Sequence, residues 1–281
     1  MDFLLAPFNY DFFRTGLLAG VLVGALCGLL GVYIVLRGMS YIGHGLSHAV
    51  FGGAAVAFIT KANFYLGAGA WGFLAAVLIN ETVRRFKISA DAAIGIVTTA
   101  SFAVGVAIIS SQHRFTRDLE ASLFGSLLGV SPEEVLAILI VTVVIAVGVI
   151  LLYKQLLFTT FDEETARAFG VRTRWIDTFF SLALAAAVIV SMQRLGVTLI
   201  AAAIVIPPIT ARLLTDRLDR MILISVIMGS ITAMIGMYLS YYVDVASGAT
   251  IVLTQTALFL VAALYSTLIR RNRLAAIHYH V

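Results

Sequence analysis

Nine long stretches with almost no charged residues constrain this sequence more than any other feature. They are Thr15 to Leu36, Gly38 to Thr60, Phe64 to Asn80, Ala92 to Gln112, Val135 to Tyr153, Thr178 to Met192, Leu195 to Ala211, Met221 to Val243 and Ser247 to Ile269. A helix needs roughly 20 apolar residues to cross a bilayer core about 30 Å thick. Backbone amides in hydrocarbon must be hydrogen-bonded within the protein, which favours helices. Because only 12% of the residues are charged, about half the share of a soluble domain, the sequence predicts an all-α, polytopic transmembrane helical bundle.

Two of these stretches are short, and they decide how many spans we expect. Thr178 to Met192 and Leu195 to Ala211 are separated only by Gln193 and Arg194. If one of the two is partly re-entrant, eight spans remain, and otherwise there are nine. No segment has the composition of a soluble domain, so residues 1–281 are predicted to form a single transmembrane domain.

Lysine and arginine are distributed unequally between the two sets of connections. Cytoplasmic loops retain positive charge, so the richer set predicts the cytoplasmic side. With nine alternating spans, the N-terminus is external and the C-terminus cytoplasmic, and the external connections hold only Arg14, Lys61, Arg114, Arg117 and Arg194. We therefore expect a multi-pass protein of a cell membrane, surrounded by lipid. The basic residues lie in short loop clusters, which does not suggest a nucleic-acid partner.

Ionisable side chains at depth occur in only one stretch, the second, which contains His44 and His48. Such residues inside a membrane span are candidates for function. Residues four apart lie on one face of a helix, and neutral imidazoles at that spacing can both reach one metal ion. The alternative is that each histidine hydrogen-bonds a neighbouring helix. Two histidines are an incomplete metal site, but a second copy across a symmetry axis would supply four nitrogens.

Glycines and prolines mark two further helices. Gly16, Gly20, Gly24 and Gly28 recur every four residues along the first stretch, a pattern typical of a helix-packing face. The pair Pro207 and Pro208 is predicted to break the seventh stretch, as a gating kink or as static packing.

Several motifs are absent from the sequence. It has no Gly-x-x-x-x-Gly-Lys phosphate loop for binding ATP. The stretches hold no acidic or basic relay of the kind that proton- or sodium-coupled carriers use. There is no His-Glu-x-x-His metalloprotease motif. The chain is therefore expected not to be an enzyme.

One cytoplasmic connection, Lys154 to Trp175, is long enough to hold structure. Its segment Asp162 to Gly170 begins with acidic residues, has Arg167 near its end and finishes with glycine. That order suits the dipole and the C-terminal cap of a short helix.

Three segments together resemble the permease subunits of bacterial ABC importers for manganese, zinc and iron. They are Arg37 to Ala54 (RGMSYIGHGLSHAVFGGA), Ala90 to Gly105 (ADAAIGIVTTASFAVG) and Gly196 to Leu214 (GVTLIAAAIVIPPITARLL). The resemblance covers nearly the whole chain. It implies a helical permease of the type II ABC importer kind, located in the bacterial inner membrane. It also implies a homodimer that pairs with two cytoplasmic ATPase subunits and with an extracellular or periplasmic metal-binding protein.

The resemblance also assigns residues. The second-span motif of the family usually reads Gly-Asp-Ala-Leu-Ser-His-Ala-Val, with its aspartate and histidine facing the translocation path. The histidine corresponds to His48, whereas His44 stands at the aspartate position, and Phe51-Gly52-Gly53 replaces Leu-Pro-Gly. The resemblance also implies a cytoplasmic coupling segment near residues 155–175, which contacts the ATPase. Its residues here are Asp162, Glu163, Ala166 and Gly170. Asp91 matches an acidic position at the start of the second motif, where capping of a helix N-terminus is the alternative to metal release.

The sequence thus predicts a permease subunit that imports manganese, zinc or iron by alternating access. The metal is the transported substrate, no cofactor is bound permanently, and ATP hydrolysis occurs in a partner. One alternative is a permease for haem, siderophore or cobalamin, whose path needs no paired histidines. Another alternative is a stand-alone metal channel or carrier, which would recruit no ATPase.

Overall fold

The computed structural model describes residues 5–60, 63–111, 127, 129–196 and 200–278, and these ranges contain helices and no β-strand. The elements are η1 (Ala6–Asn9), α2 (Asp11–Leu36), α3 (Ile42–Ile59), α4 (Phe64–Phe86), α5 (Ala90–Ser111), α7 (Pro132–Leu151), α8 (Tyr153–Phe161), α9 (Glu163–Ala168), α10 (Thr173–Leu195), α11 (Ile200–Leu214), α12 (Leu218–Val243) and α13 (Ser247–His278). The sequence also predicts a short surface helix at Leu119 to Val130, in the long external connection Gln112 to Glu134, and this segment falls mostly outside the described residues.

Each of the nine predicted stretches corresponds in its main part to a different helix, which confirms the all-α bundle. Among the described residues, seven helices are long and apolar enough to cross a membrane. The helix that contains Thr178 to Met192 is α10, and it reaches 23 residues because it begins at Thr173 and ends at Leu195. In contrast, α11 has only 15 residues. Since 15 residues make about 22 Å of helix, α11 is shorter than a bilayer core.

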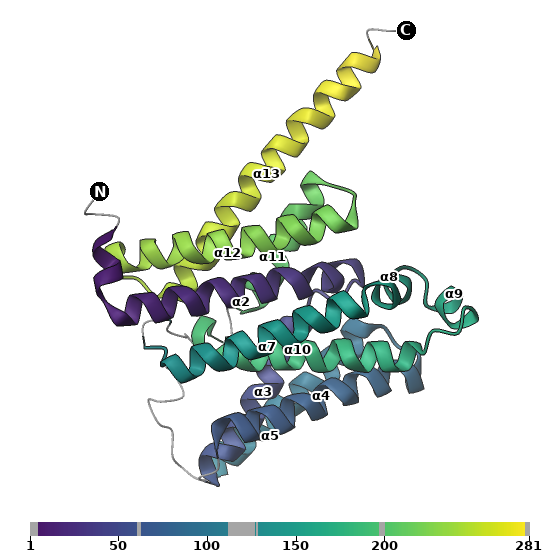
Figure 1. The fold of residues 1–281 in the computed structure, drawn as a ribbon. Helices are drawn as coiled ribbons and strands as arrows, with labels where there is room; N and C mark the ends of the chain where they lie inside the picture. Colours follow the sequence, from purple (N-terminus) through teal and green to yellow (C-terminus); the bar gives the residue numbers. More distant parts are fainter. Residues whose placement is uncertain (1–4, 61–62, 112–126, 128, 197–199, 279–281) are drawn as a thin grey trace.

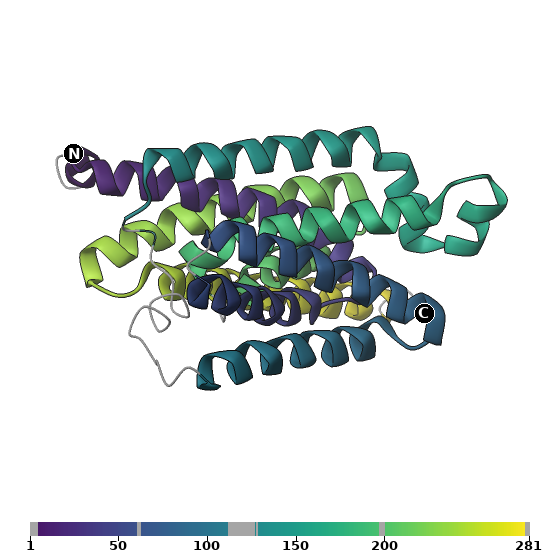
Figure 2. The same cartoon turned by 90° about the horizontal axis from the view of Figure 1, so that it is seen from below.

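The helices form two groups joined by α10 (Figures 1 and 2). In the first group, α2 packs against α12, α11 and α7, and α13 packs on α12 and α11. In the second group, α3, α4 and α5 pack on one another. Helix α10 contacts α4 and α3 on one side and α2 and α7 on the other. Helices α8 and α9, which we call the arm, project from the end of the bundle opposite η1.

Close packing of α2 against α12 depends on the predicted glycine face. A β-carbon at Gly24 would lie 2.3 Å from the carbonyl oxygen of Gly229, and one at Gly229 would lie 2.2 Å from the oxygen of Gly24. One turn along, a β-carbon at Gly28 would lie 2.5 Å from the carbonyl oxygen of Ser225, whose hydroxyl donates to the Gly28 carbonyl at 2.7 Å. The two backbones therefore touch directly.

The prolines do not break their helix, contrary to the prediction. Pro207 and Pro208 lie inside α11, which continues without interruption to Leu214. They lack amide hydrogens, so the carbonyls of Ala203 and Ile204 receive no intrahelical hydrogen bond. Helix α2 covers this position, because a β-carbon at Gly31 would lie 2.0 Å from the Ile204 oxygen. Close packing against glycine accommodates the proline pair within a continuous helix.

Arg37, at the end of α2, joins the arm to the bundle. Its guanidinium donates to Thr160 at 3.1 Å and to Thr159 at 2.9 Å, both on α8. It also pairs with Asp177 of α10 at 2.8 Å and stacks over the ring of Phe180, with the guanidinium carbon 4.7 Å from the ring centroid. The arginine side chain is only 11% exposed. This network fixes α8 against the ends of two spans.

The contact between Gly24 and Gly229 predicts that alanine substitution lowers the stability of the protein strongly at this position and little at an uncrowded glycine. Changing Gly24→Ala places a methyl group against the Gly229 carbonyl and forces α2 and α12 apart, which we expect to cost about 1–3 kcal/mol. The check is the thermal melting temperature of the detergent-purified protein. Gly69→Ala, in α4, is the matched control, because a β-carbon there meets no atom within 4 Å. Equal melting temperatures for the two variants would contradict the packing role of Gly24.

Candidate functional site

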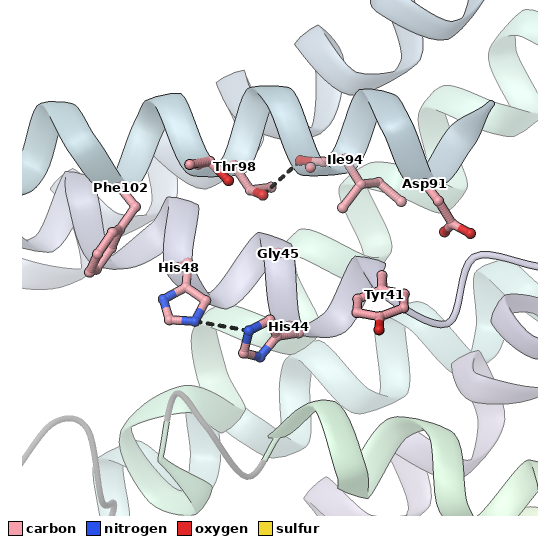
Figure 3. A pocket seen from close by; sticks show the side chains of 10 residues that line it. Tyr41, His44, Gly45, His48, Asp91, Ile94, Thr98 and Phe102 are labelled. Carbon is pink, nitrogen blue, oxygen red and sulfur yellow. Dashed lines mark hydrogen bonds between the residues drawn. The ribbon is translucent and has the colours of Figure 1, made fainter. Parts of the chain in front are cut away.

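A cavity of about 530 Å³ opens between α3 and α5 and contains the two predicted histidines (Figure 3). The wall from α3 and the residues before it consists of Tyr41, His44, Gly45 and His48. The opposite wall, from α5, consists of Asp91, Ile94, Gly95, Thr98, Thr99 and Phe102. Both walls therefore come from segments that carry the family resemblance.

Glycines bring α3 and α5 close enough to form this cavity. A β-carbon at Gly45 would lie 2.6 Å from Cγ2 of Ile94, and one at Gly52 would lie 2.6 Å from the carbonyl oxygen of Ser101. From the other side, a β-carbon at Gly105 would lie 2.6 Å from the Cα of Gly52. The spacing of the two walls is thus set by glycines, which have no side chain to keep the helices apart.

The histidines face each other across one turn of α3. Their Nε2 atoms are 3.2 Å apart, and the rings meet edge to face with centroids 4.5 Å apart. Phe102 packs edge-on against His48 at 5.1 Å between centroids. The Nδ1 atom of His48 is buried without a hydrogen-bond partner among the described residues. Ring contacts between the two histidines and with Phe102 therefore hold the pair. A hydrogen bond between the two Nε2 atoms requires one of them to donate and the other to accept.

The nitrogen separation also suits a shared metal ion. Metal–nitrogen bonds of about 2.0–2.1 Å at a tetrahedral angle place two ligand nitrogens about 3.3 Å apart. In the described part of the chain, no three His, Cys, Asp or Glu side chains are gathered to hold a metal. The described part of one chain therefore supplies two nitrogen atoms at a spacing that one metal ion could bridge, on the wall of a partly open cavity.

Asp91 lines the same cavity, at the end farthest from His48 (Figure 3). It lies within the first turn of α5 and is exposed. Ser89 makes the capping interaction instead, because its hydroxyl accepts a hydrogen bond from the amide of Ala92 at 3.3 Å. Asp91 therefore does not cap α5, and its exposed carboxylate lies at one end of the cavity.

The residues predicted to couple the chain to an ATPase lie in and beside α9 of the arm. Asp162 caps α9 by accepting the amide of Thr165 at 2.9 Å, and hydrogen bonds from Thr165 hold the pKa of Asp162 below its ordinary value. Glu163 pairs with Arg167 along α9. Gly170 has a φ of +81°, which confirms the predicted glycine end of this short helix. Ala166 is fully buried, so its side chain packs inside the arm. The exposed surface of α9 is formed by the residues on either side of it.

Sequence reasoning missed two sets of residues. Thr98, Thr99 and Phe102 form one wall of the cavity, and the only signal for them was the matched segment Ala90 to Gly105. Asp177 lies just before the apolar stretch that begins at Thr178, but it belongs to the same helix, because α10 begins at Thr173. The signal in the sequence was the Asp177 carboxylate itself, which lies about one helical turn after the start of α10.

Comparisons with known proteins cover nearly the whole chain. Residues 9–266 match the ABC 3 transport family. The manganese transport system membrane protein MntC of Listeria monocytogenes is 36% identical over 266 residues, covering 95% of each chain. The chelated iron transport system membrane protein YfeC of Yersinia pestis is 35% identical, covering 95% of this chain and 90% of its own. The solved structure of PsaBC from Streptococcus pneumoniae with a Fab superposes with a TM-score of 0.82 at 33% identity, covering 93% of this chain and 94% of that one.

Proposed function

Because the chain belongs to the ABC 3 transport family, we propose that it is the membrane-spanning subunit of an ATP-driven importer of divalent transition metal ions. The observation that carries this proposal is the histidine pair, with its nitrogens 3.2 Å apart on the wall of an open cavity. The metal passes as substrate by alternating access, and a cytoplasmic ATPase subunit hydrolyses ATP. The names of relatives favour manganese or iron as the cargo, and the nitrogen ligands also suit zinc.

The transport site forms between two copies of the chain. His44 and His48 of each copy supply two nitrogens, and the open side of the cavity leaves room for the second pair. A four-nitrogen set suits zinc and iron, whereas carboxylate ligands suit manganese better. The imidazole of His44 therefore shifts the metal preference of the transport site toward zinc and iron. The external binding protein selects the ion that is delivered.

The arm transmits the movement of the ATPase. Its exposed aromatic side chains, Phe161 at 65% and Phe169 at 79% exposure, suit burial in a partner. Arg37 ties α8 to α2 and α10 and directly precedes the turn into α3, so a displacement of the arm reaches the histidine helix. The arm end is then cytoplasmic, and the η1 end faces the external binding protein, in agreement with the distribution of Lys and Arg.

Substitution of the histidines tests the transport site. His48→Ala removes a nitrogen ligand and is expected to lower metal uptake at least about tenfold. His44→Asp exchanges a nitrogen for an oxygen ligand, so it should keep transport and shift the relative uptake toward manganese over zinc. The measurement is uptake of manganese, iron and zinc by the reconstituted complex with one fixed binding protein. Full activity of the double variant His44→Ala, His48→Ala would remove both residues from the mechanism.

Substitution on the arm tests coupling. Phe169→Ala with Glu164→Lys changes only exposed side chains of the arm. We expect the variant to insert and fold normally but to lose ATPase stimulation and transport, because the partner contact is weakened. Ala166→Arg is the comparison, since it disrupts the interior of the arm and should also lower the melting temperature. Normal ATP-driven uptake by the Phe169→Ala, Glu164→Lys variant would exclude this surface as the docking site.

A further inference from the structure

A second cavity lies at the arm end of the bundle, and we propose that it binds the headgroup of an anionic phospholipid. The cavity measures about 350 Å³ and lies between the last turns of α4 and the first turns of α10. Its lining includes Val77, Asn80, Glu81, Arg84, Arg174 and Trp175. Both helices have the length and composition of membrane spans, so a cavity at their ends lies at the height of lipid headgroups.

The charges at this cavity favour an anion. Glu81 is already shared between Arg174 at 2.8 Å and Arg85 at 3.6 Å. The other acid of the lining, Asp177, is paired with Arg37 at 2.8 Å. Arg84 is exposed and forms no ion pair with any residue that the structure describes. Each of the two acids already has an arginine partner at 2.8 Å, so Arg84, which also lies in the field of Asp177, adds positive charge to the cavity beyond those ion pairs.

The apolar part of the lining favours a lipid over a soluble anion. Val77 lies one turn before Glu81 and is 40% exposed, and Phe73 lies one further turn along α4 and is 38% exposed. This row offers a track for an acyl chain on the outer face of α4. Trp175 is 67% exposed beside the arginines, as tryptophan commonly is at the membrane interface. Basic pockets between helix ends on the cytoplasmic side bind lipid phosphates in this way.

This inference is independent of the cargo, since neither histidine lines the cavity. Native mass spectrometry of the full chain in detergent, with added phosphatidylglycerol or phosphatidylcholine, tests it. The wild type should prefer phosphatidylglycerol. Arg84→Gln should weaken that lipid about fivefold, the factor for about 1 kcal/mol per basic residue, and it breaks no ion pair within the described chain. Arg84→Gln combined with Arg174→Gln should weaken it about 25-fold. Glu81→Gln releases Arg174 and should strengthen binding.

Arg217→Gln is the matched control for the Arg174 substitution, because Arg217, like Arg174, pairs with a carboxylate, Asp219 at 3.1 Å, but lies in the turn before α12. It should leave the lipid preference unchanged. Unchanged phosphatidylglycerol binding by Arg84→Gln and by the double arginine variant would overturn the proposal. So would complete displacement of the lipid by millimolar inorganic phosphate, which would reveal a site for a soluble anion.

Discussion

Direct contact between helix backbones at glycine is the interaction on which the rest of this structure depends. Lipid tails are as apolar as leucine, so membrane helices gain little from burying apolar side chains against each other, and close packing must supply the attraction. Here the contact recurs in both helix groups: Gly24 meets Gly229 between α2 and α12, and Gly52 meets Gly105 between α3 and α5. The first contact assembles the central group. The second sets the width of the cavity that holds the histidines, so the same device serves stability and the site.

The ion pairs between different helices have another distribution, because those that the described residues form lie at the arm end of the bundle. Arg37, Asp177 and the threonines of α8 form one network there, and Glu81 with Arg174 forms another between α4 and α10. Charges at helix ends avoid the cost of crossing hydrocarbon. The arm is therefore attached through hydrogen bonds to the Arg37 guanidinium, whereas the spans are held together by close backbone packing at glycines. One arginine side chain thus joins the arm to the ends of α2 and α10.

The sequence predicted most of the fold because absence of charge is a local property that depends on no partner. It placed every described span-length helix, the glycine face of α2, the histidine pair on one helix face and the short helix at Asp162 to Gly170. What it missed depends on tertiary contacts. Asp177 is tolerated inside α10 because Arg37 reaches it from another helix. Pro207 and Pro208 leave α11 intact because Gly31 lets α2 cover the freed carbonyl. The threonine wall opposite the histidines belongs to α5, and no periodicity within α3 reveals it.

The proline pair gives α11 a mechanical character that its neighbours lack. A helix resists bending through its ladder of amide-to-carbonyl bonds, and α11 is missing two consecutive rungs near its middle. Helix α11 contacts α2, α12 and α13 and also α3, so, like α10, it connects the first helix group with the helix that carries the histidines. Any displacement of those two groups against each other would bend α11 more easily than its neighbours, because α11 lacks two of its backbone hydrogen bonds.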